Sequence, residues 1–224
     1  MTLCALRSAG LIMWTRRRFL KVVSWLPSLS LLPDSFPIRF ASKAWAQAKQ
    51  VLSKGFPREE LISMNPAEVD SRNLDVDPLD KFGTMGPTDV FIDAKTFTLK
   101  VTGKVGRPLS LSFEEILKRQ PLTEAVLLIC PGFFAYNGQW QGVTVKALIE
   151  EAQVKKEAEF VDVKGAHEKV LRISMRNVDQ KKIFLAYNVN GARLPRKHGA
   201  PLRLVYEGVY GSDWVKYVDE LEVV

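Results

Sequence analysis

The sequence predicts an α+β fold that is rich in strands and has few short helices. Short apolar segments separated by turn residues recur along most of the chain, whereas only two segments carry a helix-capping signal. No internal repeat and no long linker interrupts them. The 224 residues, 46% of them hydrophobic and 25% charged, are enough to bury a substantial core. This composition excludes a collagen, a low-complexity polymer and a disordered acidic tail.

Residues 1–46 have the three parts of an export signal. A basic segment, Thr15 to Lys21, precedes an apolar stretch from Val22 to Leu32, and Ala44-Trp45-Ala46 supplies a cleavage site. The apolar stretch is too short to span a membrane. The paired arginines followed by Phe-Leu-Lys resemble a twin-arginine signal. We therefore expect export by the twin-arginine machinery, removal of the signal near Ala46 and a periplasmic or otherwise exported mature protein.

Two alternatives bear on this N-terminal segment. A basic amphipathic helix is the simpler interpretation of the charges, but Pro27 and Pro33 argue against a long helix. Because twin-arginine signals usually begin close to their arginine pair, we hypothesise that Met13 is the true start.

Removing the signal changes what the charge implies. The formal charge of +7 and the pI near 9.4 are typical of proteins that bind nucleic acid or anionic membranes. The signal, however, holds seven of the 32 basic residues and one of the 25 acidic residues, which leaves a net charge of +1. We therefore expect no nucleic-acid partner. Cys4 is also lost, so Cys130 stays as a single cysteine that is buried, pairs with another chain or acts chemically.

Residues 47–95 lack clear periodicity and contain several prolines, so we expect an irregular arm that wraps a domain or lines a site. Residues 96–224 form the main predicted domain. Its first strand alternates from Phe97 to Thr102 and closes at Gly103. A capping box at Ser112-Phe113-Glu114-Glu115 begins a short helix that runs to Lys118 or Arg119.

The middle of this domain holds a buried strand and a second helix. Ala125 to Cys130 is a continuous apolar run that stops at Pro131-Gly132, so we expect Cys130 where a core strand meets a loop. Thr144 caps a helix that ends near Ala152. The remaining predicted strands are 160–163, 170–174, 183–189, 202–206 and 215–223. Asn190-Gly191 is a hairpin turn signal.

Four features could carry chemistry. Cys130 alone is more often a small core residue than a site. His198 and Arg203 flank a Gly-Ala-Pro turn and suit a phosphate, although a solvated basic loop explains them equally well. The turn Gly208 to Gly211, followed by Trp214-Val215-Lys216, lets backbone N–H groups approach an anion. The fourth feature, Gln139 to Val143 before the second helix, by itself indicates packing.

In this order, the segments resemble the molybdopterin-binding domain of the sulfite oxidase family. The resemblance runs from about Phe97 to Val223. It is carried by the stretch from Cys130 to Trp140-x-Gly142-Val143, and by a closing stretch. The closing stretch includes Asn190-Gly191, Leu194-Pro195, His198-Gly199-Ala200-Pro201-Leu202-Arg203, Tyr210-Gly211 and Val215-Lys216. The resemblance implies a sulfite-oxidase-type fold of mixed sheets, and the export signal agrees with it, because bacterial members are commonly exported with their cofactor.

The resemblance also implies a role for particular residues. Cys130 matches the cysteine whose thiolate binds molybdenum. His198 and Arg203 match positions that hold the pterin and its phosphate, and the backbone of Trp214-Val215 together with Lys216 matches a further cofactor contact. One molybdenum-molybdopterin per chain would support oxygen-atom transfer, with electrons passing singly to or from a separate membrane haem protein or soluble cytochrome.

One departure from the family bears on the substrate. Sulfite-oxidising members place an asparagine and an arginine shortly after the metal-binding cysteine, whereas Pro131 to Tyr136 carries no positive charge. A neutral or partly apolar substrate is favoured, such as a sulfoxide or N-oxide, small or protein-bound. Exported members that reduce methionine sulfoxide in proteins are the precedent, although their cofactor-contacting arm motif matches only loosely around Asp77 to Thr84.

Three other functions stay open. They are sulfite-type oxidation, a cofactor-free binding or electron-transfer accessory domain that retains the fold, and thiol redox catalysis at Cys130. The last of these lacks a resolving cysteine in the mature sequence.

Overall fold

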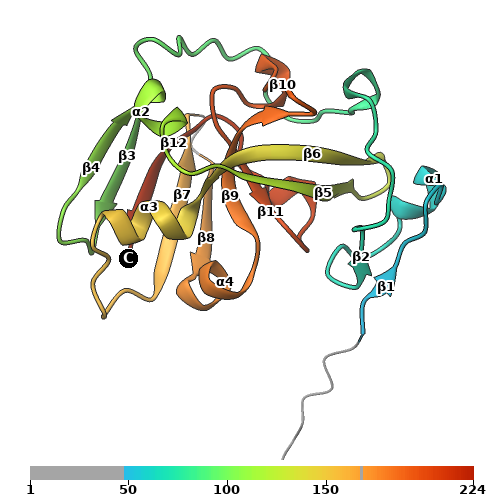
Figure 1. Ribbon diagram of the computed structural model, residues 1–224, viewed down its shortest axis with the longest axis horizontal. Helices are drawn as coiled ribbons and strands as arrows, with labels where there is room; N and C mark the ends of the chain where they lie inside the picture. The colour runs from blue at the N-terminus through green and yellow to red at the C-terminus, as the bar shows by residue number, and fades with distance from the viewer. Residues whose placement is uncertain (1–47, 167–168) are drawn as a thin grey trace, which may run out of the picture. The chain divides into compact units, whose positions relative to one another are not determined.

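The computed structural model describes residues 48–166 and 169–224. The expected export signal therefore lies outside the described residues. Two five-stranded sheets and a small two-stranded sheet account for the strands in the described ranges. Figure 1 shows one large sheet to the left, with β3, β4, β7, β8 and β12, and the long β5–β6 hairpin of the other extending to the right.

The first large sheet is antiparallel and is built around β9. Its order is β10-β9-β6-β5, and β11 also pairs with β9. The strands are β5 Leu122–Cys130, β6 Phe134–Thr144, β9 Ile183–Val189, β10 Ala192–Arg193 and β11 Arg203–Tyr206. In the β5–β6 hairpin, Cys130 stands opposite Phe134, so only residues 131–133 form the turn. The hairpin signal at Asn190-Gly191 is confirmed, since both residues have positive φ and join β9 to β10.

The second large sheet is mixed. Its order is β4-β3-β12-β7-β8, in which β12 runs parallel to β3 and the other pairs are antiparallel. The strands are β3 Thr98–Gly103, β4 Leu109–Ser112, β7 Phe160–Gly165, β8 Val170–Ser174 and β12 Val218–Val223. β12, the last strand of the chain, pairs with β3, the first strand of this domain. The sheet therefore depends on contacts between residues that are distant in sequence.

Three short helices begin at side-chain caps. α2 (Phe113–Leu117) has the expected capping box at Ser112, and α3 (Val145–Glu151) begins where the Thr144 hydroxyl accepts from the Ala147 amide. α4 (Met175–Gln180) begins in the same way at Ser174. None of these helices, nor any other in the described ranges, is long and apolar enough to cross a membrane.

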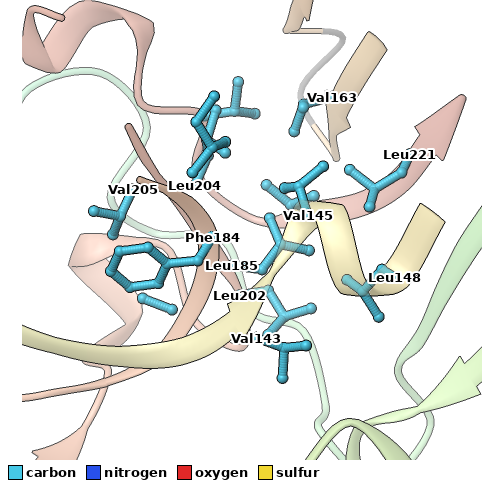
Figure 2. Close-up of a cluster of buried hydrophobic side chains, with 14 of the residues drawn as sticks. Val143, Val145, Leu148, Val163, Phe184, Leu185, Leu202, Leu204, Val205 and Leu221 are labelled. Carbon is cyan, nitrogen blue, oxygen red and sulfur yellow. The ribbon is translucent and has the colours of Figure 1, made fainter. Parts of the chain in front are cut away.

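The main core lies where α3 packs on the two sheets. Figure 2 shows the side chains that meet there, from the end of β6, from α3 and from strands of both sheets. The labelled residues are Val143, Val145, Leu148, Val163, Phe184, Leu185, Leu202, Leu204, Val205 and Leu221. All ten are 1% exposed or less, so they form a continuous apolar interior.

The arm, residues 48–95, is attached to the outer edge of the β5–β6 hairpin. It contains β1 (Gln50–Val51), α1 (Arg58–Leu61), β2 (Val69–Asp70) and a 3₁₀ turn at Leu79–Lys81. Leu52 and Leu61 pack in a second cluster with Ile129 of β5. The carboxylate of Asp77 accepts from the Arg58 guanidinium and from the Asn137 amide of β6. These contacts fix the arm residues that follow, and those residues reach the candidate site.

The structure corrects the sequence prediction at four elements. Residues 134–144 form β6, although a loop was expected after Cys130, and β4 and α4 were not predicted. The last strand begins at Val218 instead of residue 215, because residues 215–217 bend across β11, where only Lys216 bridges to Arg203. β6 escaped prediction because its buried positions include the polar Asn137, which is held by hydrogen bonds to the arm, and the glycines Gly138 and Gly142, so the strand shows neither a continuous apolar run nor alternation.

Candidate functional site

A cavity of about 300 Å³ opens beside the turn end of the β5–β6 hairpin. Its walls come from four parts of the chain. The arm contributes Gly83–Pro87, the hairpin contributes Leu128, Cys130, Phe134 and Tyr136, and the C-terminal part contributes Arg203, Gly211, Ser212, Trp214, Lys216 and Tyr217. Lys169 completes the lining. None of these residues is an Asp or Glu, so the cavity walls in the described ranges carry positive charge and no acidic side chain.

Cys130 contributes a free, partly buried thiol to this cavity. It is the last residue of β5, and the turn that follows is tight because Gly132 adopts φ +75°. Burial raises the pKa of the thiol, so without a metal or cation to stabilise the thiolate the sulfur stays protonated at neutral pH. The thiol donates to the Met85 thioether, with 3.2 Å between the two sulfur atoms.

Arg203 is a buried cation that forms no ion pair with any residue the structure describes. It is 4% exposed, and its Nη1 donates to the backbone carbonyl of His198 at 3.1 Å, while its Nε has no partner in the described ranges. The guanidinium carbon lies 5.7 and 5.6 Å from the ring centroids of Trp140 and Trp214. Burial lowers the pKa of Arg203, which reflects the cost of holding this charge away from water.

His198 is fully buried and its imidazole is unpaired at both nitrogens within the described ranges. Burial, and then the nearby charges of Arg203, Lys197 and Lys216, lower its pKa to about 4. The ring is therefore neutral at pH 7. A buried polar group without a partner costs free energy, so a native structure that keeps one is expected to offer it a ligand, an ion or a water.

Trp214, Val215 and Lys216 follow the Tyr210-Gly211 turn. The indole Nε1 of Trp214 is also buried without a partner among the described residues. Val215 is fully buried, and its carbonyl accepts from the Leu204 amide at 2.8 Å. Burial and the charge of Arg203 lower the pKa of Lys216 to about 8.

The structure brings most of the predicted residues to one place. Four of them, Cys130, Arg203, Trp214 and Lys216, line the cavity. The other two, His198 and Val215, are buried behind this lining. The His198 carbonyl accepts from Arg203, and the Val215 carbonyl accepts from the Leu204 amide of β11. Sequence reasoning missed Leu128, Tyr136, Lys169 and Tyr217, and it reached the arm only loosely, as far as Thr84. The glycines at 83 and 86, followed by Pro87, were the available signal for the arm. Lys169 carried no signal, since it is an isolated basic residue.

The donor set fits a metal carried by an anionic organic cofactor better than a bare ion. The described residues hold no group of three or more His, Cys, Asp or Glu side chains that could enclose a metal. They do hold one thiol, which is a soft metal ligand, beside a buried cation and three unpaired donors or acceptors. A phosphate or a pterin would satisfy the unpaired groups, and additional sulfur ligands from the cofactor would complete the coordination of the metal.

Comparison with known proteins agrees with this chemistry. Residues 85–224 match the family described as the oxidoreductase molybdopterin binding domain. Over 136 residues, 58% of this chain, the sequence is 31% identical to the oxidoreductase YuiH of Bacillus subtilis and covers 68% of that protein. It is 26% identical over 167 residues to the protein-methionine-sulfoxide reductase catalytic subunit MsrP of Gluconobacter oxydans. It is 24% identical over 215 residues to the sulfite oxidase of Arabidopsis thaliana.

These last two matches cover 64% and 79% of this chain, which spans about half the length of each relative, 53% of MsrP and 52% of the sulfite oxidase. Among solved structures, the sulfane dehydrogenase SoxCD from Paracoccus pantotrophus superposes with a TM-score of 0.57 at 22% identity. That superposition covers 90% of this chain and 56% of the other. At this identity the likeness concerns the fold, and it confirms the expected strand-rich, sulfite-oxidase-type architecture.

Proposed function

Because this chain belongs to the oxidoreductase molybdopterin binding domain family, whose cofactor is molybdopterin, we propose that it is an exported molybdenum oxidoreductase. It transfers an oxygen atom to or from a neutral or partly apolar substrate of the sulfoxide or N-oxide type. The observation that carries the proposal is Arg203, a buried cation with an unpaired Nε on the wall of a cavity that also holds the Cys130 thiol. Such an arrangement calls for an anionic ligand.

Three of the residues that would hold the cofactor have polar groups without a partner among the described residues. Arg203 binds the phosphate, and His198 and the Trp214 indole add donors beside it. The backbone of Trp214-Val215 and the Lys216 side chain flank the same ligand. Cys130 binds molybdenum as a thiolate, since metal binding removes the proton that burial otherwise retains. When bound, the cofactor supplies the two-electron chemistry of oxygen-atom transfer.

The cavity lining supports the substrate class. Leu128, Phe134 and Tyr136 are apolar or aromatic neighbours of Cys130, and they exclude water from the substrate. The likeness to a methionine-sulfoxide reductase subunit points the same way. In the reducing direction the S–O bond of a sulfoxide breaks and a thioether and water form. Two protons are taken up, and two electrons arrive singly from a separate membrane haem protein or soluble cytochrome.

Lys169 favours a second candidate, sulfite-type oxidation. It is a cation on the cavity wall that could attract an anionic substrate, and a sulfite oxidase is among the relatives. Under this alternative Lys169→Gln would raise the KM for sulfite. Under the leading proposal the same variant leaves sulfoxide reduction within about twofold, because a neutral substrate gains little from a surface charge.

Metal content and a substrate screen test the proposal. Protein from a molybdenum-replete host should carry about one molybdenum per chain, and Cys130→Ala should lose the activity that the metal supports. Gln139→Ala, at an exposed position of β6, is the control. A reduced viologen dye should be oxidised on addition of sulfoxides or N-oxides. A metal-free wild type that tolerates changes at Cys130, His198 and Arg203 would instead indicate a cofactor-free accessory domain. An active Cys130→Ala variant would count against the mechanism.

Export through the twin-arginine machinery is part of the proposal. It rests on the Arg16-Arg17 pair and the Ala44-Trp45-Ala46 site of the sequence. The N-terminal sequence of the exported protein should begin near Gln47, and cytoplasmic retention of the intact chain would remove this part of the proposal.

A further inference from the structure

Residues Gly83–Pro87, which we call the strap, form one wall of the cavity. The strap includes Met85, a residue that belongs to no motif and to no expected cofactor contact. The strap is held by a side chain from far along the sequence. The Lys216 ammonium donates to Thr84 Oγ1 at 2.7 Å, to the Met85 carbonyl at 2.8 Å and to the Pro87 carbonyl at 3.1 Å. The Tyr217 hydroxyl donates to the Pro87 carbonyl at 3.2 Å. These contacts fix the strap backbone.

Close packing fixes the first residue of the strap as well. A Cβ at Gly83 would lie 2.4 Å from the Phe134 ring, so the backbone presses directly on that ring. Gly86 turns the chain with φ +70°. Between these two glycines the Met85 side chain is the longest group that the strap carries.

Met85 extends from the surface of the protein to the thiol. Its residue is 47% exposed, and its Sδ lies 3.2 Å from Cys130 Sγ. A reacting group that approaches the Cys130 thiol from the side of Met85 must therefore pass or displace that side chain. Methionine is unbranched and has several rotatable bonds, so its side chain can move while the backbone stays in place.

We propose that Met85 is a specificity-determining residue, whose side chain shields Cys130 and limits the size of the group that can enter this end of the cavity. The expected substrate selectivity rests on the proposed function. The shielding of the Cys130 thiol does not depend on that function. Slender methyl-bearing substrates fit beside a mobile thioether, and bulky aromatic ones are disfavoured. The size of the side chain at position 85, and not its sulfur, sets this limit.

The rate of Cys130 alkylation tests the shielding without a cofactor. Iodoacetamide labelling of the cofactor-free full chain, quantified on the peptide that contains Cys130, should accelerate at least about fivefold in Met85→Ala, because thiol reactivity depends on access. Met85→Leu should stay within about twofold of wild type, and Met85→Phe should be slower. A free model thiol added to the same reaction corrects for reagent concentration. Rates that do not follow the size of the side chain overturn the proposal.

The loaded enzyme provides the second measurement. In Met85→Ala the ratio of kcat/KM for phenyl methyl sulfoxide to that for dimethyl sulfoxide should rise about tenfold, mainly through a lower KM for the bulky substrate. An unchanged ratio overturns the size limit. If loaded wild type reduces neither substrate, the proposed function fails and the alkylation series alone decides whether Met85 shields Cys130.

Discussion

The residues that define the site are polar groups held in apolar surroundings. His198 is fully buried with two nitrogens unpaired among the described residues, and Arg203 is a buried cation that contacts a carbonyl, the Tyr136 hydroxyl and two indole rings. Each one lowers the stability of the cofactor-free chain, because neither group recovers the hydration it loses on folding. We interpret this cost as preorganisation for an anionic ligand, since the same groups would otherwise be replaced by apolar side chains without loss.

His198 should make the cofactor-free protein sensitive to mild acid. Its pKa is lowered to about 4 from an ordinary value of 6.5. As pH falls from 6.5 towards 4, the imidazole of the unfolded chain binds a proton and the folded one does not, so the free energy of unfolding decreases by up to about 3 kcal/mol. Above pH 6.5 both forms are neutral and this contribution is constant.

Urea denaturation at pH 7, 6 and 5 checks this expectation by comparison with His198→Gln. The other titrating groups are common to both proteins, so the change in their stability difference isolates His198. The free energy of unfolding of the wild type, measured relative to that of His198→Gln, should decrease as pH falls. A constant difference across this range would mean that the imidazole titrates normally.

At the level of elements, β6 pairs with β9 along residues 140–144, and the two backbones approach most closely at Gly142. The Trp140-x-Gly142-Val143 motif has a physical explanation here. The Trp140 indole donates to the Val126 carbonyl at 3.1 Å, and Gly142 lies at a register shift where β6 meets β9. A Cβ at Gly142 would lie 2.0 Å from the Leu185 carbonyl oxygen and 2.7 Å from the Ala186 Cα. Only glycine fits, because backbone atoms of a central strand cannot move aside.

Gly142→Ala should therefore destabilise the fold by about 2–4 kcal/mol. The midpoint of urea denaturation measures this loss. Gln139→Ala, at an exposed position on the same strand, is the control and should stay within about 0.5 kcal/mol of wild type. A cost below about 1 kcal/mol for Gly142→Ala would show that the two strands can separate locally.

The elements that the sequence predicted correctly are those with local signals. Capping residues Ser112 and Thr144 and the Asn190-Gly191 turn identify their elements within a few positions. β6 has no such signal, because Asn137 is buried through long-range hydrogen bonds to the arm. The strap was missed for the same reason. Lys216 recognises backbone carbonyls about 130 positions away, and no sequence pattern encodes which carbonyls those are.

On the scale of the whole molecule, charged groups lower the stability of the described chain at the cavity and raise it at other places. Arg172 illustrates the contrast, since its guanidinium forms two hydrogen bonds with the carboxylate of Asp162 across β7 and β8, at 2.8 and 2.7 Å. Arg203 has no carboxylate partner in the described ranges. The two arginines therefore predict opposite consequences when each is replaced by methionine, an apolar side chain of similar length.

Arg203→Met should leave the cofactor-free protein as stable as wild type or more stable by about 1–3 kcal/mol, because a buried, unpaired charge is removed. The same variant should lose cofactor loading, and with it the increase in thermal stability that a bound ligand confers on the folded state. Arg172→Met should do the reverse, with a lower melting temperature from the unpaired Asp162 and unchanged molybdenum content. Thermal denaturation of cofactor-free and loaded proteins, together with metal analysis, measures both effects. If Arg203→Met destabilises the cofactor-free chain by several kcal/mol, Arg203 is a structural residue. The principal argument for an anionic ligand in the cavity is then lost.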